Sequence, residues 1–136
     1  MKFHLEQASV GHIEAIKDFH GLLHKEIKED ATLSEDDLRS YVFEPEAKIL
    51  VASTTQDVPI GFIISKYSLE QTEIINLFVL EEYRKKQVGS YLVEMIKRWS
   101  TAKKCKELIV KHTHAKEFYL KQGFKDVEGT LVCSIN

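Results

Sequence analysis

The sequence lacks most of the features that mark a secreted or membrane protein. Its 136 residues include two cysteines and two prolines, and two cysteines without metal-like spacing provide neither a disulfide framework nor a zinc site. No apolar run approaches the roughly 20 residues that a helix needs to cross a bilayer. The N-terminal residues M-K-F-H-L-E-Q also lack the apolar stretch of a secretory signal. We therefore expect a cytoplasmic protein with no membrane partner, in which Cys105 and Cys133 are free thiols.

A large excess of one charge is also missing. The net charge of −2 argues against a nucleic-acid partner, whose binding surface would carry a strong positive field. The charges are nevertheless unevenly distributed, because residues 84–106 are mostly basic and residues 25–46 are mostly acidic. Two solvated helix faces would explain this pattern. A cationic and an anionic ligand on opposite sides of one site would explain it equally well.

The size of the chain and its 43% of apolar residues are typical of one globular domain, residues 1–136. Strands are predicted at residues 3–5, 48–53, 58–67, 74–80 and 108–111, with a closing hairpin over 124–135 that turns at Glu128-Gly129. Helices are predicted from Ser9, from Ser34, after Arg84 and over residues 114–122, with Thr113 as the cap of the last one. The order β-α-α-β-β-β-α-β-α-β-β indicates an α/β (α+β) fold, a mixed sheet covered by helices.

Residues 73–99 are the most informative stretch. A buried strand enters the basic turn Tyr83 to Gln87, and the turn opens directly into an amphipathic helix. The predicted apolar stripe of this helix is Val88, Tyr91, Leu92, Met95, Ile96 and Trp99. Its first turn directs unpaired N–H groups and the positive end of the helix dipole toward the end of the strand. We therefore predict an anion site there, suited to phosphate.

Two motifs resemble the signatures of the GCN5-related N-acetyltransferase (GNAT) superfamily. V-L-E-E-Y-R-K-K-Q-V-G-S-Y-L resembles its acyl-CoA signature, Q/R-x-x-G-x-G/A, and A-K-E-F-Y-L-K-Q-G-F resembles its second signature, A-x-x-F-Y-x-x-x-G-F. The motifs are about 30 residues apart and each lies on the expected element. The resemblance implies an acyl-CoA N-acyltransferase fold. It also implies direct transfer of an acetyl group from acetyl-CoA, without a metal, to a primary amine of a small molecule or protein.

The same resemblance implies a cofactor site. The pantetheine arm and thioester would bind the backbone of Leu77, Phe78 and Val79, and the pyrophosphate would rest on the loop made of Arg84, Lys85, Lys86, Gln87, Val88, Gly89 and Ser90. A solubilising surface turn is the alternative for the three basic residues. Gln87 replaces the first glycine of the signature, and we expect a helix-compatible backbone that still presents the amide. The asparagine that many members carry before the last helix is not evident, and His112 lies near that place.

Acetyl transfer to an amine needs a neutral nucleophile, a polarised thioester carbonyl and a proton for the departing thiolate. Glu73 lies eleven residues before Arg84, as does the catalytic glutamate of histone-acetylating members, and is the candidate base; an exposed carboxylate is the alternative. Tyr119 matches the tyrosine that donates to the CoA sulfur in similar enzymes, and core packing beside Phe118 is the alternative. Glu107, acting through water, is a more remote candidate base.

Other patterns leave alternatives open. His20 and His24 are one helical turn apart, which suits a metal pair but also surface or packing residues, and His112 and His114 are proton relays or loop residues. The acid-rich segment 26–46 spans the region that lines the acceptor pocket in the superfamily, so we expect a cationic acceptor. The main alternative function is a catalytically inactive acyl-CoA-binding or protein-interaction module. Relatives often form homodimers, and the sequence leaves the oligomeric state open.

Overall fold

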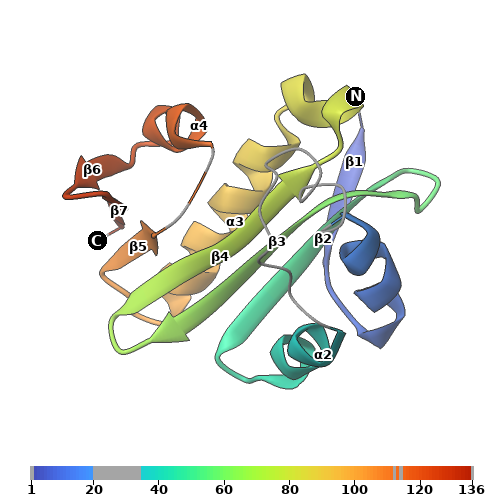
Figure 1. Cartoon of the computed structure of the whole chain (residues 1–136), viewed down its shortest axis with the longest axis horizontal. Helices are drawn as coiled ribbons and strands as arrows, with labels where there is room; N and C mark the ends of the chain where they lie inside the picture. The colour runs from blue at the N-terminus through green and yellow to red at the C-terminus, as the bar shows by residue number, and fades with distance from the viewer. Residues whose placement is uncertain (1, 20–34, 112, 114, 136) are drawn as a thin grey trace.

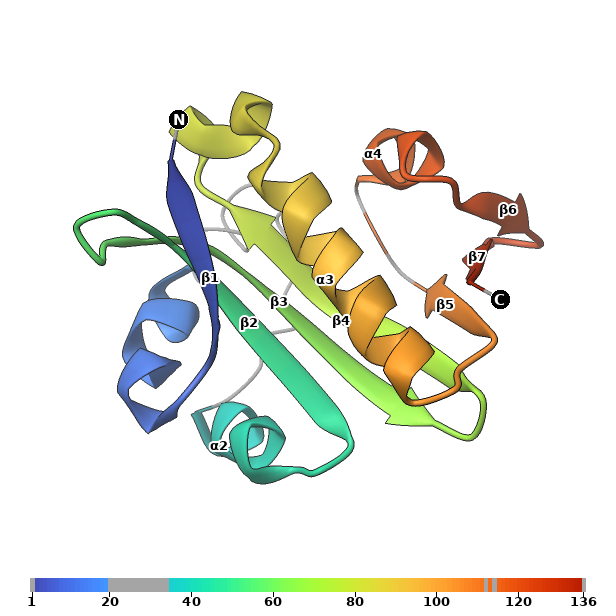
Figure 2. The same ribbon diagram turned by 180° about the vertical axis from the view of Figure 1, so that it is seen from behind.

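The chain forms a sheet with helices on both faces (Figures 1 and 2), in a computed structural model that describes residues 2–19, 35–111, 113 and 115–135. The strands are β1 (Phe3–Gln7), β2 (Ala47–Thr54), β3 (Pro59–Ser68), β4 (Gln71–Val79), β5 (Glu107–Val110), β6 (Lys125–Val127) and β7 (Thr130–Ser134). The helical elements are the 3-10 helix η1 (Val10–His12), a helix over residues 13–19, α2 (Glu35–Phe43), the 3-10 helix η2 (Glu81–Lys86), α3 (Val88–Ala102) and α4 (Lys116–Lys121). The order of strands and helices predicted from the sequence is confirmed.

The described strands make one mixed sheet in the order β1-β2-β3-β4-β5-β7-β6. All neighbouring pairs are antiparallel except β4 and β5, which are parallel. The exception follows from the connection, because α3 carries the chain back to the end of the sheet where β4 began. The mixed α/β architecture expected from the sequence is therefore confirmed.

Each face of the sheet has its own hydrophobic core. Helix α3 covers one face (Figure 2), where Leu92 and Ile96 are buried in a cluster with Tyr119 of α4. On the other face, Ile16 of the first helix and Leu38 of α2 are completely buried. Each fully buried side chain of this size stabilises the fold by about 1.5–3 kcal/mol. The sheet therefore lies between two layers of helices.

The first helix begins as predicted at Ser9, with a histidine completing its cap. The backbone N–H of Ser9 donates to Nδ1 of His12 (3.0 Å), and the N–H of His12 donates to the Ser9 carbonyl (2.9 Å). The bond from the Ser9 N–H is the half of a capping box that glutamate usually accepts, with histidine in its place; the other half is replaced by the backbone bond to the Ser9 carbonyl. His12 Nε2 also lies 3.1 Å from Glu6 Oε1. The predicted inward residues Ile13, Ile16 and Phe19 are buried; Leu23, Ile27, His20, His24 and Ser34 lie outside the described residues.

The apolar stripe predicted for α3 was wrong in part. Tyr91 and Met95 are 52% and 38% exposed, whereas Val93, which the stripe omitted, is completely buried. The helix is rotated so that Val88, Leu92, Val93 and Ile96 face the sheet. Tyr91 instead packs its ring edge-on against Phe3 of β1, with 5.5 Å between the centroids. Three- and four-residue spacing defines two overlapping faces of a helix, and tertiary packing selects between them.

The C-terminal elements also differ slightly from the prediction. Helix α4 begins at Lys116 after Ala115, so Thr113 is not its cap, although its Oγ1 accepts a hydrogen bond from the Ala115 N–H (2.9 Å). Strand β4 begins at Gln71 rather than Ile74. The predicted Glu128-Gly129 turn is confirmed, because both residues have positive φ (54° and 92°), as a type I′ hairpin turn requires.

Gly61 lies in β3, where β4 approaches too closely for a side chain. A Cβ at this position would lie 2.7 Å from the Phe78 carbonyl oxygen, a backbone atom that cannot move independently. We expect Gly61→Ala to lower the free energy of unfolding by about 2 kcal/mol, measured by urea denaturation. Gly11→Ala is the matched control, because its Cβ would find its nearest neighbour at 3.6 Å. Equal stability of the two variants would contradict the proposed clash.

Candidate functional site

Strands β4 and β5 pair over three residues and then diverge. The ladder comprises Gln71↔Glu107, Thr72↔Leu108 and Glu73↔Ile109. Beyond Glu73, β4 runs on to Val79, whereas β5 ends at Val110 and turns away (Figure 1). Within the described residues, the edge of β4 from 74 to 79 that faces β5 therefore has no strand partner. Unpaired backbone donors and acceptors on such an edge can bind an extended ligand.

The pairing with β3 determines which residues present their backbone at this open edge. A register shift makes Ile75 the extra residue of a β-bulge. After the bulge, the Leu80 N–H donates to the Ile60 carbonyl (2.8 Å), so the backbone N–H of Leu80 points toward β3. Alternation along an antiparallel strand then directs the backbone of Phe78 toward β3 and that of Leu77 and Val79 toward the open edge. This geometry narrows the predicted set of backbone ligands from three residues to two.

The turn after β4 is the 3-10 helix η2, and Arg84 folds back from it onto the end of the strand. Arg84 Nε donates to the Val79 carbonyl oxygen at 2.8 Å. Its guanidinium carbon lies 5.5 Å from the centroid of the Phe78 ring, within the range of a cation–π contact. The Lys86 side chain is exposed; the Lys85 side chain lies outside the described part of the structure.

Gln87 separates η2 from α3 in a conformation that the sequence did not predict. Its φ of 66° and ψ of 12° place it in the left-handed region. The prediction of a helix-compatible backbone at Gln87 was therefore wrong. A residue with a Cβ pays about 1 kcal/mol or more for this conformation, whereas glycine adopts it freely. The Gln87 side chain makes no capping hydrogen bond to α3. The first-turn amides of Val88, Gly89 and Ser90 are therefore not occupied by a cap and can receive an anion.

Gly89 also lies at the packing contact between α3 and α4. A Cβ on Gly89 would lie 3.2 Å from Cζ of Phe118, so a larger residue there would require the Phe118 ring to shift by a few tenths of an ångström. Two side-chain contacts hold the same pair of helices. Gln122 Nε2 donates to Ser90 Oγ (3.0 Å), and Lys97 Nζ donates to the Gln122 carbonyl (2.9 Å). Sequence reasoning missed these contacts with Gln122, because hydrogen bonds between distant residues have no local pattern.

Tyr119 is the most deeply buried of the predicted site residues that carry a reactive group. It is 3% exposed and lies edge-on between Phe118 and Phe124, with 5.2 Å between centroids in each case. Desolvation by burial raises the pKa of its phenol above the ordinary value of 10.0. Its hydroxyl makes no hydrogen bond to any residue that the structure describes. A buried hydroxyl without a partner costs stability, so this one suits a ligand that completes the pair.

Glu73 lies on the other face of the sheet from Tyr119. Its neighbours in β4, Thr72 and Ile74, face α3: Thr72 Oγ1 receives a hydrogen bond from Ser100 of α3 (2.7 Å), and Ile74 belongs to the core under α3. Alternation then directs Glu73 to the opposite face, where its Oε1 is 3.7 Å from Lys111 Nζ. The open edge of β4 begins directly after Glu73. A ligand bound along this open edge would border both faces of the sheet.

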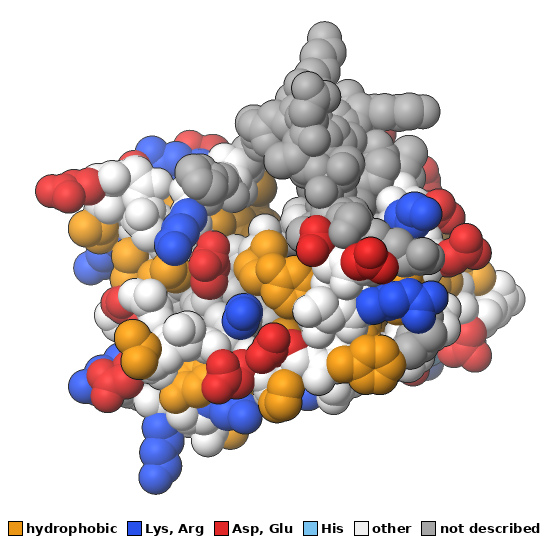
Figure 3. Space-filling view, turned by 60° about the horizontal axis from the view of Figure 1, so that its bottom comes forward, with side chains coloured by type: hydrophobic (Ala, Val, Ile, Leu, Met, Phe, Trp, Pro, Cys, Tyr) orange, Lys and Arg blue, Asp and Glu red, His pale blue; other side chains and the backbone are white. Residues whose placement is uncertain are grey.

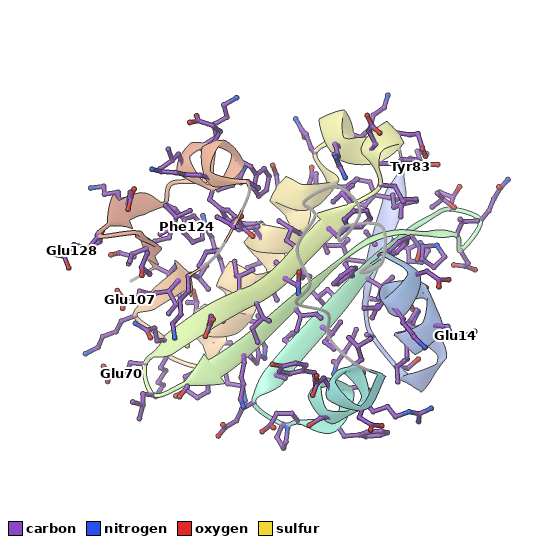
Figure 4. All side chains as sticks on the ribbon, viewed as in Figure 1. Glu14, Glu70, Tyr83, Glu107, Phe124 and Glu128 are labelled. Carbon is purple, nitrogen blue, oxygen red and sulfur yellow. The ribbon has the colours of Figure 1, made fainter. Side chains whose placement is uncertain are left out.

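Glu107 is less suitably placed. Its carboxylate accepts a hydrogen bond from Gln71 Nε2 (2.6 Å) at the start of β4. In Figure 4, Glu107 and Glu70 lie at one end of β4 and Tyr83 of η2 lies at the other. Its carboxylate is therefore farther than Glu73 from the loop that would hold a cofactor. His112 and His114 lie outside the described residues.

Several charged side chains of the acid-rich segment are exposed in the part of the chain that the structure describes. Of the acid-rich segment, Asp36, Asp37 and Glu46 are exposed; Glu26, Glu29 and Asp30 lie outside the described residues. In Figure 3, acidic and basic side chains are interspersed over the face shown. The described residues contain no group of three potential metal ligands from His, Cys, Asp and Glu. They also contain no helix with the length and apolar character needed to span a bilayer.

We expect Gln87→Gly to leave CoA affinity unchanged or to improve it, because the loop amides stay in place and the left-handed residue loses its Cβ. The free energy of unfolding should change by less than about 1 kcal/mol, since relief of strain is offset by the greater entropy of glycine in the unfolded chain. Calorimetric titration with CoA and urea denaturation provide the two measurements. A marked loss of CoA affinity would show that the glutamine side chain itself contributes to the site.

Comparison with protein families gives a clear match. A family model described as an acetyltransferase (GNAT) domain matches residues 45–126, more than half of the chain. No curated protein matches the sequence significantly. The matched residues include β2 to β5, all of α3 and α4, and the first two residues of β6.

Solved structures share the fold. An acetyltransferase of the GNAT family from Staphylococcus aureus Mu50 superposes with a TM-score of 0.85 at 12% identity, covering 99% of this chain and 100% of that one. The PaiA N-acetyltransferase from Thermoplasma acidophilum, in complex with coenzyme A, gives 0.79 at 18% identity over 97% of both chains. The N-acetylglutamate synthase from Neisseria gonorrhoeae, complexed with coenzyme A and N-acetyl-glutamate, gives 0.87 at 16% identity, covering all of this chain but 36% of that one.

Proposed function

Because the chain belongs to the acetyltransferase (GNAT) family, we propose that it is an N-acetyltransferase, which transfers an acetyl group from acetyl-CoA directly to a primary amine. The family and fold support acyl transfer and binding of acetyl-CoA in general. The proposal extends them to this chain as one domain over residues 1–136, since β1 pairs with β2 in the same sheet. The observation that carries it is the divergence of β4 from β5, which leaves the backbone of Leu77 and the N–H of Val79 on an edge without a strand partner in the described residues.

In this proposal, one part of acetyl-CoA binds the open edge of β4 and another part binds the N-terminus of α3. Leu77 and Val79 would hold the pantetheine arm and thioester through backbone hydrogen bonds, as an added strand binds a sheet edge. The amides of residues 84–90 would surround the pyrophosphate, with the dipole of α3 favouring its negative charge. The exposed Lys86 would add a charge-assisted contact from its side chain. The observations that fit this assignment are the missing side-chain cap of α3 and the unpaired edge of β4.

The chemistry would use Glu73 and Tyr119 from opposite faces of the sheet. Glu73, directly or through water, accepts a proton from the acceptor amine, whose nitrogen attacks the thioester carbon. The C–N bond forms and the C–S bond breaks. Tyr119 donates its phenolic proton to the departing sulfur, and its raised pKa keeps that proton in place at neutral pH.

The acceptor would be a cationic amine, small molecule or protein side chain. The support is the acidic character of α2 and its flanks, where Asp36, Asp37 and Glu46 are exposed on the helix layer that covers the Glu73 face. A carboxylate-rich approach raises the local concentration of cations. An acetyl-CoA turnover screen over cationic, neutral and anionic amines tests the preference. Exclusive activity on neutral or anionic acceptors would overturn it.

The experiment that tests the proposal as a whole joins binding to turnover. Calorimetry with acetyl-CoA and CoA should show binding to the wild-type protein, and a thiol-release assay should show turnover on at least one amine. Binding without turnover over a broad panel would favour the inactive acyl-CoA-binding module instead. Absence of CoA binding would rule out both the enzyme and the module.

A further inference from the structure

The side chain of Arg84 contacts the end of strand β4. Its Nε donates to the Val79 carbonyl oxygen at 2.8 Å, and its guanidinium lies over the Phe78 ring at 5.5 Å. Both contacts are with the last two residues of β4, beyond the point at which β5 has left the sheet edge. The arginine thus supplies a hydrogen bond to the strand edge that a neighbouring strand would otherwise supply.

Val79 needs such support because it ends the strand beside an open edge. Its carbonyl points away from β3, so pairing within the described sheet leaves it without a donor. A charged donor makes a stronger hydrogen bond than a neutral one. With the Val79 carbonyl held by Arg84, the N–H of Val79 remains a donor without an acceptor among the residues that the structure describes. In the proposed site, that N–H would be one of the edge donors that hold the pantetheine arm and thioester.

We infer that Arg84 is a positioning residue for acetyl transfer: its Nε–H fixes the end of β4 at Val79, and its charge is not used on the pyrophosphate. The inference rests on the proposed function and concerns the same site. It separates the side chain of Arg84, which holds the strand, from the loop amides and Lys86, which would hold the phosphates. A neutral side chain with an N–H at the same distance from the backbone should therefore replace arginine.

Glutamine provides that N–H. Its Nε2 is separated from Cα by the same number of bonds as Nε of arginine, whereas methionine has similar length and no donor. We expect Arg84→Gln to keep kcat/KM with acetyl-CoA within about threefold and Arg84→Met to lower it about tenfold, mostly in kcat. Arg84→Lys, which keeps the charge on a nitrogen one bond farther out, should also lose activity. Arg98→Ala is the control for loss of an arginine, because Arg98 is exposed on α3 and pairs with Glu94 of the same helix.

Acetyl-pantetheine distinguishes the two roles directly, because it contains the thioester and pantetheine arm and no pyrophosphate. A positioning role predicts that Arg84→Met loses the same factor with acetyl-pantetheine as with acetyl-CoA, while Lys86→Ala loses affinity for acetyl-CoA alone. A loss with acetyl-CoA and none with acetyl-pantetheine, together with rescue by lysine and not glutamine, would assign the Arg84 charge to the pyrophosphate and overturn the inference.

Amide hydrogen exchange tests the same contact without turnover. The Leu80 N–H, which donates to Ile60 at the end of the strand, should exchange about tenfold faster in Arg84→Met and at the wild-type rate in Arg84→Gln. Unchanged exchange in the methionine variant would refute the role of Arg84. Faster exchange in that variant, in a protein that turns over no amine, would instead support the strand contact and refute the proposed function.

Discussion

Replacing Tyr119 with phenylalanine is expected to slow thiol release about 100-fold, near the lower end of what a positioned general acid contributes. The substitution removes one hydroxyl from a ring that is 3% exposed and packed edge-on against Phe118 and Phe124. The aromatic core is therefore retained and CoA affinity should stay within about twofold, since the missing interaction forms as charge develops on sulfur. The fall should appear in kcat and kcat/KM alike.

The pH dependence provides an independent check on Tyr119. Burial raises the pKa of this phenol above 10.0, so its proton remains bound as the pH rises from 7 to 10. The wild-type rate should consequently not fall in this range through ionisation of Tyr119. Tyr91→Phe is the matched control, because the Tyr91 ring is 52% exposed on α3 and should leave turnover unchanged. Full activity of Tyr119→Phe would assign this tyrosine to core packing alone.

Local sequence patterns predicted those parts of the fold that local chemistry determines. Alternating and continuous apolar runs located the strands, and Glu128-Gly129 located a turn that requires two positive φ angles. The left-handed conformation of Gly123, with φ of 97°, also follows from its place after a short helix. Two motifs on consecutive helices then identified a family that the domain match bears out.

The details that distinguish this site depend on tertiary contacts. The left-handed Gln87 lies between two helical elements, and no neighbouring residue in the sequence signals it. The face that α3 buries depends on the sheet beneath it, so Val93 was missed and Tyr91 was misplaced. The hydrogen bond from Arg84 to Val79 requires a side-chain conformation that residue types alone do not specify. The site residues proposed from sequence thus stay a prediction, and the fold determines which of their atoms face the open edge of β4.

The divergence of β4 and β5 relates the positions of Tyr119 and Glu73 to each other. Tyr119 approaches from the α3 and α4 layer and Glu73 faces the opposite layer, so neither helical layer contains both groups. A continuous sheet would separate the proposed acid from the proposed base. The opening after Glu73 would remove that barrier toward the end of β4, where the N–H of Val79 also faces the open edge. The same break in pairing would thus serve binding and chemistry together.

Replacing Glu73 with glutamine is expected to lower kcat/KM about 100-fold at neutral pH. A lysine-like amine with a pKa near 10.4 is neutral about once per thousand molecules at that pH, so transfer depends on a group that accepts its proton. Glutamine matches the shape of glutamate and cannot act as that base. The deficit should shrink as the pH rises toward the pKa of the acceptor, because more of the amine is then already neutral. Steady-state rates between pH 6.5 and 10 measure this convergence.

Two further glutamates make the Glu73 experiment specific. Glu70→Gln makes the same charge change in the β3–β4 turn, where Glu70 is exposed and pairs with Lys106 at 3.0 Å, so its activity should match the wild type. Glu107→Gln tests the more remote base and should cost less than threefold. Calorimetry should give the same CoA affinity for Glu73→Gln and wild type, because Glu73 lies on the face away from α3. A Glu73→Gln enzyme with wild-type turnover and an unchanged pH profile would transfer the role of base to water or to the acceptor pocket itself.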